Sequence, residues 1–313
     1  MNDTTATLSR ERLELKERSW FYKALNTALK CPYVLIAPAI IVALWMVIYP
    51  IFFGLYASFT KWDMFTKSFT WVGLANYKFL LVSEDFWKTM GNTLLYMVVF
   101  VLAGISLNVL LGVFLNKNKP AHNLIQTIMF TPHIISFVSV ALIWLWLMQP
   151  ANGILNYVLN ILGLKSSYWY RSADSSLLSI LIVALWKGMG YGVLVVISGL
   201  RSIPQYVYEA ARLDKSSKPN TFFKITLPLL SPTLFFLIVT SVVSSFCTYD
   251  VVALMTKGGT DNSSNLLAYY IYQQGFLFGH FGRAMAASMI LLVMTSVISF
   301  LNFKFAGKEV HYQ

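Results

Sequence analysis

Six long apolar segments, separated by polar stretches, dominate the chain. Each segment is mostly apolar and about 20 residues long or longer, which is the length that an α-helix needs to cross a bilayer. The pattern therefore predicts an all-α, polytopic membrane protein with six transmembrane helices. The helices are expected at residues 33–59, 93–115, 124–148, 177–200, 227–253 and 284–303.

Composition agrees with a membrane protein and argues against a soluble domain and against a nucleic-acid-binding protein. Of the 313 residues, 57% are hydrophobic and 12% are charged, whereas soluble domains carry about 25% charged residues. The net charge of +11 does not indicate a nucleic-acid partner, because the basic residues lie beside the apolar segments. Cys31 and Cys247 have neither metal-ligand nor redox spacing, so we expect two free thiols and no metal site.

The distribution of lysine and arginine predicts the orientation. Six spans place both termini and the loops after spans two and four on one side. That side holds more basic residues, including five in the loop after span four, so we expect it to be the cytoplasmic face of the membrane. Residues 1–30 form a polar leader without the features of a cleavable signal, with a surface helix expected near residues 11–20. The membrane domain would span residues 31–313.

A polar stretch, YEAARLDKSSKPNTFFKITLPLLSP at residues 208–232, interrupts the apolar pattern on the basic side. It predicts two short helices. Ser202 and Gln205 form a capping-box pattern before the first helix, which should end near Asp214, and Ser217 can cap the second. Such a compact unit can dock into a partner's groove or lie on the membrane surface, and the pattern leaves both open.

The same stretch resembles a known motif. Glu209, Ala210, Ala211 and Asp214, followed by ITLP at residues 225–228, look like the EAA motif of binding-protein-dependent ABC importer permeases. The resemblance implies a coupling loop at about 201–226 that docks into a cleft of an ATPase subunit. Glu209 would then make a polar contact, and the two alanines would permit close approach.

One position departs from the motif. The family usually has glycine after the aspartate, and this chain has Lys215. A lysine in the left-handed turn that glycine favours costs up to about 1 kcal/mol. We therefore expect an altered turn or a strained lysine.

Further segments resemble the sugar-permease branch of this family, nearest to the first permease of maltose and glycerol-phosphate systems. They begin at Trp71, Asn92, Trp144, Tyr249 and Asn265. The resemblance implies four kinds of partner: a second permease subunit, an ATPase dimer, an extracytoplasmic solute-binding protein and a carbohydrate or polyol substrate.

Ionisable residues within apolar spans indicate where substrate would pass, because they should face protein or water. Lys187 lies in span four and Asp250 near the end of span five. Aromatic and hydroxyl side chains beside them suit the C–H faces and hydroxyls of a sugar. The candidate path residues are Trp186, Lys187, Tyr191, Phe246, Thr248, Tyr249 and Asp250. The neighbouring Gly188, Gly190 and Gly192 could allow close helix packing or local unwinding. Alternatively, Lys187 snorkels or pairs structurally, and the three glycines serve packing only.

Several functional motifs are missing from the sequence. It has no P-loop, so ATP would be bound by partner subunits and no cofactor by this chain. It has no H-x-x-E-H, G-x-S-x-G or C-x-x-C pattern, and we expect no enzyme activity. An ion-coupled transporter that works alone is the alternative; it predicts paired intramembrane carboxylates or an inverted repeat, and only Asp250 fits.

Overall fold

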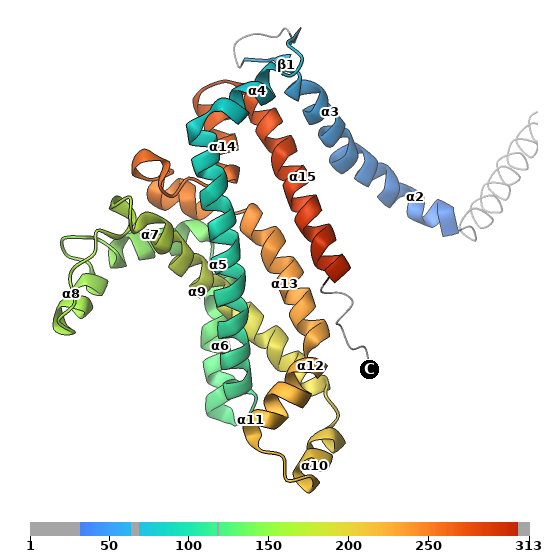
Figure 1. Cartoon of the computed structure of the whole chain (residues 1–313), viewed down its shortest axis with the longest axis vertical. Coiled ribbons are helices and arrows are strands. Elements are labelled where there is room, and N and C mark those ends of the chain that lie inside the picture. Colours follow the sequence, from blue (N-terminus) through green and yellow to red (C-terminus); the bar gives the residue numbers. More distant parts are fainter. Residues whose placement is uncertain (1–31, 64–68, 118, 306–313) are drawn as a thin grey trace, which may run out of the picture. The chain divides into compact units, whose positions relative to one another are not determined.

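The computed structural model describes residues 32–63, 69–117 and 119–305 (Figure 1). The surface helix predicted near residues 11–20 falls outside these residues and stays a prediction. Contacts divide the chain into two units, Met1–Tyr56 and Ala57–Gln313, and each is described by itself below.

The described part of the first unit is helical. Its elements are α2 (Pro32–Ala43), the π-helical turn η1 (Leu44–Ile48) and α3 (Tyr49–Ser58), which ends two residues into the second unit. Together they form one candidate span of 27 residues. Its large apolar side chains are mostly exposed, which suits contact with lipid.

The second unit contains three unbroken long helices and two bent helix pairs. The long helices are α5 (Glu84–Leu115), α9 (Ser176–Ser202) and α15 (Phe281–Phe305). One pair joins α6 (Pro120–Ile134) to α7 (Phe137–Leu147); the other joins α11 (Lys218–Thr221), η3 (Phe222–Thr226) and α12 (Leu227–Leu229) to α13 (Ser231–Phe246). The described residues therefore contain four candidate spans, or six if each bent pair is one span. The all-α class is confirmed, whereas six spans stays a prediction.

Two predicted spans were wrong in detail. The third was expected as one helix over 124–148, but α6 and α7 meet at 105°, after a proline inside α6 at Pro132. The fifth was expected to reach Ala253, but α13 ends at Phe246 and is bent by 65° from the helical segment before it. Apolar composition predicts the length of a segment and carries no information about such bends.

Short elements connect the long ones. A two-stranded antiparallel sheet pairs β1 (Thr60–Lys61) with β2 (Thr70–Trp71). The remaining elements are α4 (Ala75–Val82), α8 (Ile154–Ile161), η2 (Trp169–Arg171), η4 (Val252–Thr256), η5 (Thr260–Asn262), α14 (Leu267–Tyr272) and η6 (Gln273–Leu277).

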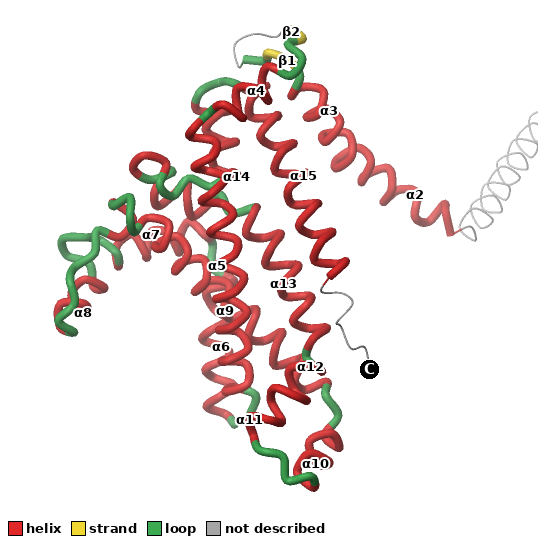
Figure 2. Tube along the Cα trace, viewed as in Figure 1, coloured by secondary structure: helices red, strands yellow, loops and turns green. Residues whose placement is uncertain are grey.

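Helix α9 packs against α5, α6 and α13. All four helices belong to the second unit and are labelled in Figure 2. Small residues on α9 permit these contacts. A Cβ at Gly190 would collide with the Met129 carbonyl of α6, and one at Gly192 with the Asn108 amide of α5. Because α9 is helical throughout, these two glycines serve packing and not unwinding.

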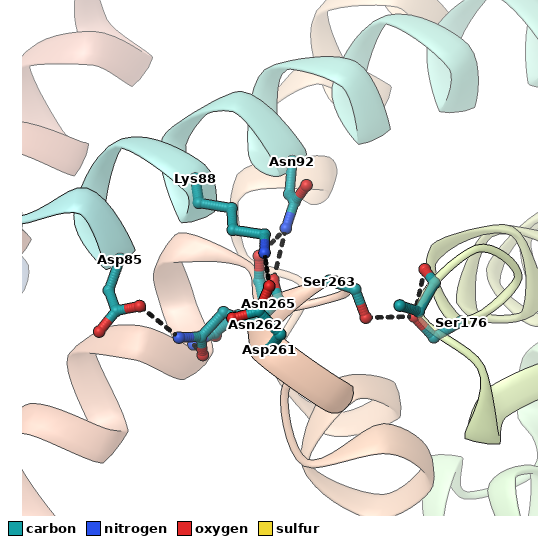
Figure 3. A network of polar contacts seen from close by, with 9 residues as sticks. Asp85, Lys88, Asn92, Ser176, Asp261, Asn262, Ser263 and Asn265 are labelled. Carbon is teal, nitrogen blue, oxygen red and sulfur yellow. Dashed lines mark hydrogen bonds and ion pairs between the residues drawn. The ribbon is translucent and has the colours of Figure 1, made fainter.

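A network of polar side chains fixes one end of the α5–α9 pair, and we call it the 261–265 clasp (Figure 3). Lys88 of α5 pairs with Asp261. The Asn92 amide of α5 donates to the carbonyls of Asn262 at 2.8 Å and Asn265 at 3.3 Å. Two further bonds complete the clasp: Asn262 Nδ2 to Asp85 Oδ1 at 2.9 Å, and Ser263 Oγ with Ser176 Oγ of α9 at 2.9 Å.

Candidate functional site

A cavity of about 330 Å³ lies among α5, the α6–α7 bend, α9 and α13. Its wall combines hydroxyl, aromatic and small residues with few charges. This mixture of apolar surface and a few polar groups is usual for sites that bind small molecules.

The cavity brings together five of the seven predicted path residues: Lys187, Tyr191, Thr248, Tyr249 and Asp250. Trp186 lies outside it, where its ring meets Trp144 edge-on at 5.5 Å. Phe246 also lies outside it: its side chain is 1% exposed and packs in an apolar cluster with Val101 and Val242.

The Lys187 ammonium is held by the bend between α6 and α7. Its Nζ donates to the carbonyl oxygens of Pro132 at 3.0 Å, His133 at 3.3 Å and Ile135 at 2.6 Å. The bend frees these carbonyls from helical bonding, and the side chain, 8% exposed, lies 4.6 Å from the centre of the Phe137 ring. The structural pairing considered from the sequence is therefore present, although Lys187 also lines the cavity.

The cavity includes residues that the sequence analysis missed. Thr240 and Ser244 of α13 line it, as does Thr248 just after that helix, and the three follow one another at intervals of four residues. On α5, Tyr96, Gly104 and Asn108 lie along one face at multiples of four. Residues at i and i+4 share a helix face, so this hydroxyl periodicity was a usable signal.

Aromatic rings form two groups on or beside the wall. His133 stacks on Tyr191 with ring centres 5.2 Å apart. Tyr249 contacts Tyr269 at 5.9 Å and Tyr272 at 5.2 Å. Such rings offer flat apolar faces together with hydrogen-bonding edges.

The predicted loop after α9 folds as two short helices. Helix α10 (Gln205–Leu213) has Asp214 as its C-cap, which agrees with the expected end near Asp214. The Lys215 N–H bonds to the Arg212 carbonyl at 3.0 Å and the Ser216 N–H to the Ala211 carbonyl at 3.0 Å, which is a Schellman arrangement. Lys215 has φ = 52°, so of the two expectations the strained lysine is correct.

The expected side-chain caps of the two short helices are not formed. Ser202 is the last residue of α9, and its hydroxyl donates to the Gly199 carbonyl at 2.8 Å. Ser217 does precede α11, but its side chain makes no capping bond. Ser216 instead bonds Asn220 at 2.9 Å.

Helix α10 has one packed face and one exposed face. Val207 and Tyr208 pack on the cluster that contains Ile203 and Leu230, and Ala211 is buried. The other face exposes an apolar stripe, which we call the α10 stripe: Tyr206, Ala210 and Leu213, the last 84% exposed.

Charged side chains surround the α10 stripe. Glu209 lies beside it and is exposed, as are Asp214 and Lys215. Among the described residues, none of these three side chains forms an ion pair or a hydrogen bond.

Comparison with known proteins identifies the family. Residues 101–306, well over half of the chain, match the family of binding-protein-dependent transport system inner membrane components. The chain belongs to this family. It is 32% identical over 284 residues to the sn-glycerol-3-phosphate transport system permease protein UgpA of Agrobacterium fabrum, covering 90% of this chain and 96% of that protein.

Solved structures share the fold of this transport-family member. A chain of a bacterial ABC transporter that imports the acidic polysaccharide alginate aligns with a TM-score of 0.79 at 25% identity, covering 93% of this chain and 99% of that chain. A second structure of such a transporter, in complex with an alginate pentasaccharide-bound periplasmic protein, gives 0.77 at 23% identity over 93% and 95% of the two chains. The family is a transport family of membrane components, which agrees with the expected lack of enzyme activity and disfavours the ion-coupled alternative.

Proposed function

We propose that this chain is one of two permease subunits of an ATP-driven importer for a carbohydrate or related polyol. It would cross a bacterial cytoplasmic membrane six times, with both termini and the 201–226 loop in the cytoplasm. The proteins named above belong to transporters of glycerol 3-phosphate and of alginate, which supports a carbohydrate or polyol but leaves the charge of this chain's substrate to its own residues.

The exposed face of α10 carries the proposal. Leucine and tyrosine side chains as exposed as Leu213 and Tyr206 usually mark an interaction site when they cluster. An unpaired glutamate between them adds polar specificity. Both features suit helix-in-groove docking on an ATPase subunit, with Glu209, Ala210, Asp214 and Lys215 at or near the contact. Ala211, expected there from the motif, is buried on the opposite face of α10.

Helix α9 would connect the ATPase to the cavity. It carries Lys187 and Tyr191 at the cavity and leads through Ile203 directly into α10. Because Ile203 is buried beside Leu200 and Leu230, a displacement of α10 would move α9 as a unit. This is a route for the alternating access that nucleotide binding would drive.

The proposed partners supply what this chain lacks. Two ATPase subunits would bind ATP, a solute-binding protein would deliver substrate, and a second permease would close the open side of the cavity. Lys187, Tyr191, Thr248, Tyr249 and Asp250 would line the path on this chain's side.

Co-purification with uptake measurements tests the proposal. Tagged chain is extracted gently from membranes, its partners are identified, and the assembly is reconstituted into liposomes with its solute-binding protein. We expect a P-loop ATPase and a second six-span chain, and sugar uptake that requires ATP. Uptake that persists without any ATPase subunit would overturn the assignment.

A further inference from the structure

The two charged side chains on the cavity wall differ in whether a ligand can form hydrogen bonds with them. The wall contains one lysine, Lys187, and one aspartate, Asp250. All three N–H groups of a lysine ammonium can donate, and Lys187 has three carbonyl partners in the α6–α7 bend. This cation is therefore saturated by its own chain.

The aspartate, by contrast, interacts electrostatically with Lys187 but has no hydrogen-bond partner among the described residues. Asp250 is exposed, and within the described part of the chain its carboxylate accepts no hydrogen bond and forms no ion pair. An ionised carboxylate accepts hydrogen bonds and donates none. The available charge on this wall is thus negative.

The neutral polar groups add further acceptors. The Thr240 hydroxyl bonds the Phe236 carbonyl at 2.8 Å, and the Thr248 hydroxyl bonds the Ser244 carbonyl at 3.2 Å. Since a carbonyl can only accept, the Thr240 hydroxyl uses its hydrogen within α13. The Thr248 hydroxyl, just after α13, uses its hydrogen on the Ser244 carbonyl or on the Tyr96 hydroxyl at 3.4 Å. Both oxygens keep lone pairs for the cavity.

A wall whose unpaired charge is a carboxylate fits one class of ligand. Anions are held by converging N–H donors and free cations, whereas sugar hydroxyls supply donors. Resting on the proposed function, we propose that this chain's side of the path selects carbohydrates without anionic groups, with Asp250 as a specificity-determining residue. Sugar phosphates and uronates are disfavoured.

The chain's own thiol can measure the charge of this wall. Cys247 is exposed and lines the cavity, and Cys31→Ser leaves it as the chain's only cysteine. The assembled importer is treated with two methanethiosulfonates, one carrying trimethylammonium and one carrying sulfonate. Each rate is divided by the rate for a free thiol in the same buffer, so the ratio of the two reports local potential.

We expect the cationic reagent to react about fivefold faster, or more, than the anionic one. Asp250→Asn should reduce this preference at least about threefold, and added salt should weaken it. Asp174→Asn is the matched control, because that carboxylate is exposed and does not line the cavity. A preference for the sulfonate reagent, or a ratio unaffected by Asp250→Asn, would overturn the inference.

Uptake by the same assembly gives the second readout. Probes are neutral maltotriose and raffinose against trigalacturonate and glycerol 3-phosphate, each with ATP. Transport of an anionic probe as fast as any neutral one would contradict the selection. Lack of ATP-dependent uptake for every probe would count against the proposed function instead, while the thiol ratio would still decide the charge of the wall.

Discussion

The two ends of α9 differ in how their polar groups are satisfied. At Ser176, the 261–265 clasp joins α9 and α5 to a loop that is distant in sequence, through hydrogen bonds and an ion pair (Figure 3). Beyond Ser202, the exposed charges between Glu209 and Lys224 form no ion pair or hydrogen bond with other described residues. That end instead exposes the α10 stripe.

The end of α9 at Ser176 is therefore held by contacts within the chain, whereas the end beyond Ser202 presents a surface for another molecule. Polar groups with partners inside the chain hold helices in fixed relation. Exposed apolar and unpaired charged groups add little stability to the chain itself. Mutations in the clasp should therefore lower stability, whereas mutations in the α10 stripe should lower assembly and transport.

Charge reversal at Glu209 should have the largest effect. Glu209→Lys places a cation at the proposed contact, and we expect ATP-dependent uptake to fall more than about tenfold without a change in melting temperature. Glu84→Lys is the control, an exposed helical glutamate on α5 that should cost about 0.3–1 kcal/mol in stability and leave coupling intact. Normal uptake by Glu209→Lys would remove the coupling role from α10.

Loss of one amide from the clasp should come next. Asn92→Leu leaves the carbonyls of Asn262 and Asn265 without this donor, so we expect about 1–3 kcal/mol lower stability in denaturant titrations. Asn220→Ala in the coupling loop, whose amide bonds only the Ser216 hydroxyl among the described residues, should cost less than about 0.5 kcal/mol. Equal losses would mean that the two ends do not differ.

Truncation of the α10 stripe should give a smaller change in binding. Leu213→Ala removes apolar surface that we expect the ATPase to cover, which weakens subunit affinity by about 1–2 kcal/mol, roughly tenfold. Val82→Ala, a similarly exposed side chain on α4 at 85%, should leave affinity unchanged. Titration of purified ATPase against permease in nanodiscs measures both; unchanged affinity for Leu213→Ala would exclude this face.

The smallest expected effect is a gain in stability. Lys215→Gly relieves the left-handed backbone after α10 and should stabilise that helix end by up to about 1 kcal/mol. Slower amide hydrogen exchange at Ala211–Ser216 would register the change. Lys218→Gly, at a position with ordinary helical backbone, should show no gain; faster exchange in Lys215→Gly would contradict the strain.

The sequence predicts most of the fold because spans need long apolar runs. The positions of α5, α9 and α15 follow from runs at 93–115, 177–200 and 284–303, and the end of α10 follows from Asp214. The bend between α6 and α7 could not be predicted, since its stabilising partner, Lys187, lies 52 residues beyond Ile135. A proline at Pro132 was the only local sign.

The site was predicted less completely for a related reason. Lys187 and Asp250 stood out because charges are rare in apolar spans. Thr240 and Ser244 did not, although their spacing of four with Thr248 indicates one face. Rings such as Trp186 and Phe246 are apolar enough to pack anywhere, so sequence alone could not separate wall from core. The clasp residues read as an ordinary polar loop.

The length of α5 sets how far the clasp stands from the lipid. Its 32 residues extend about 48 Å at 1.5 Å per residue, whereas the hydrocarbon layer is about 30 Å thick. Even tilted by about 20°, the helix projects well past the acyl chains. The first turns of α5, with Asp85 and Lys88, can therefore lie among lipid headgroups or in water. Charged side chains there need not be buried, and a soluble protein can contact them.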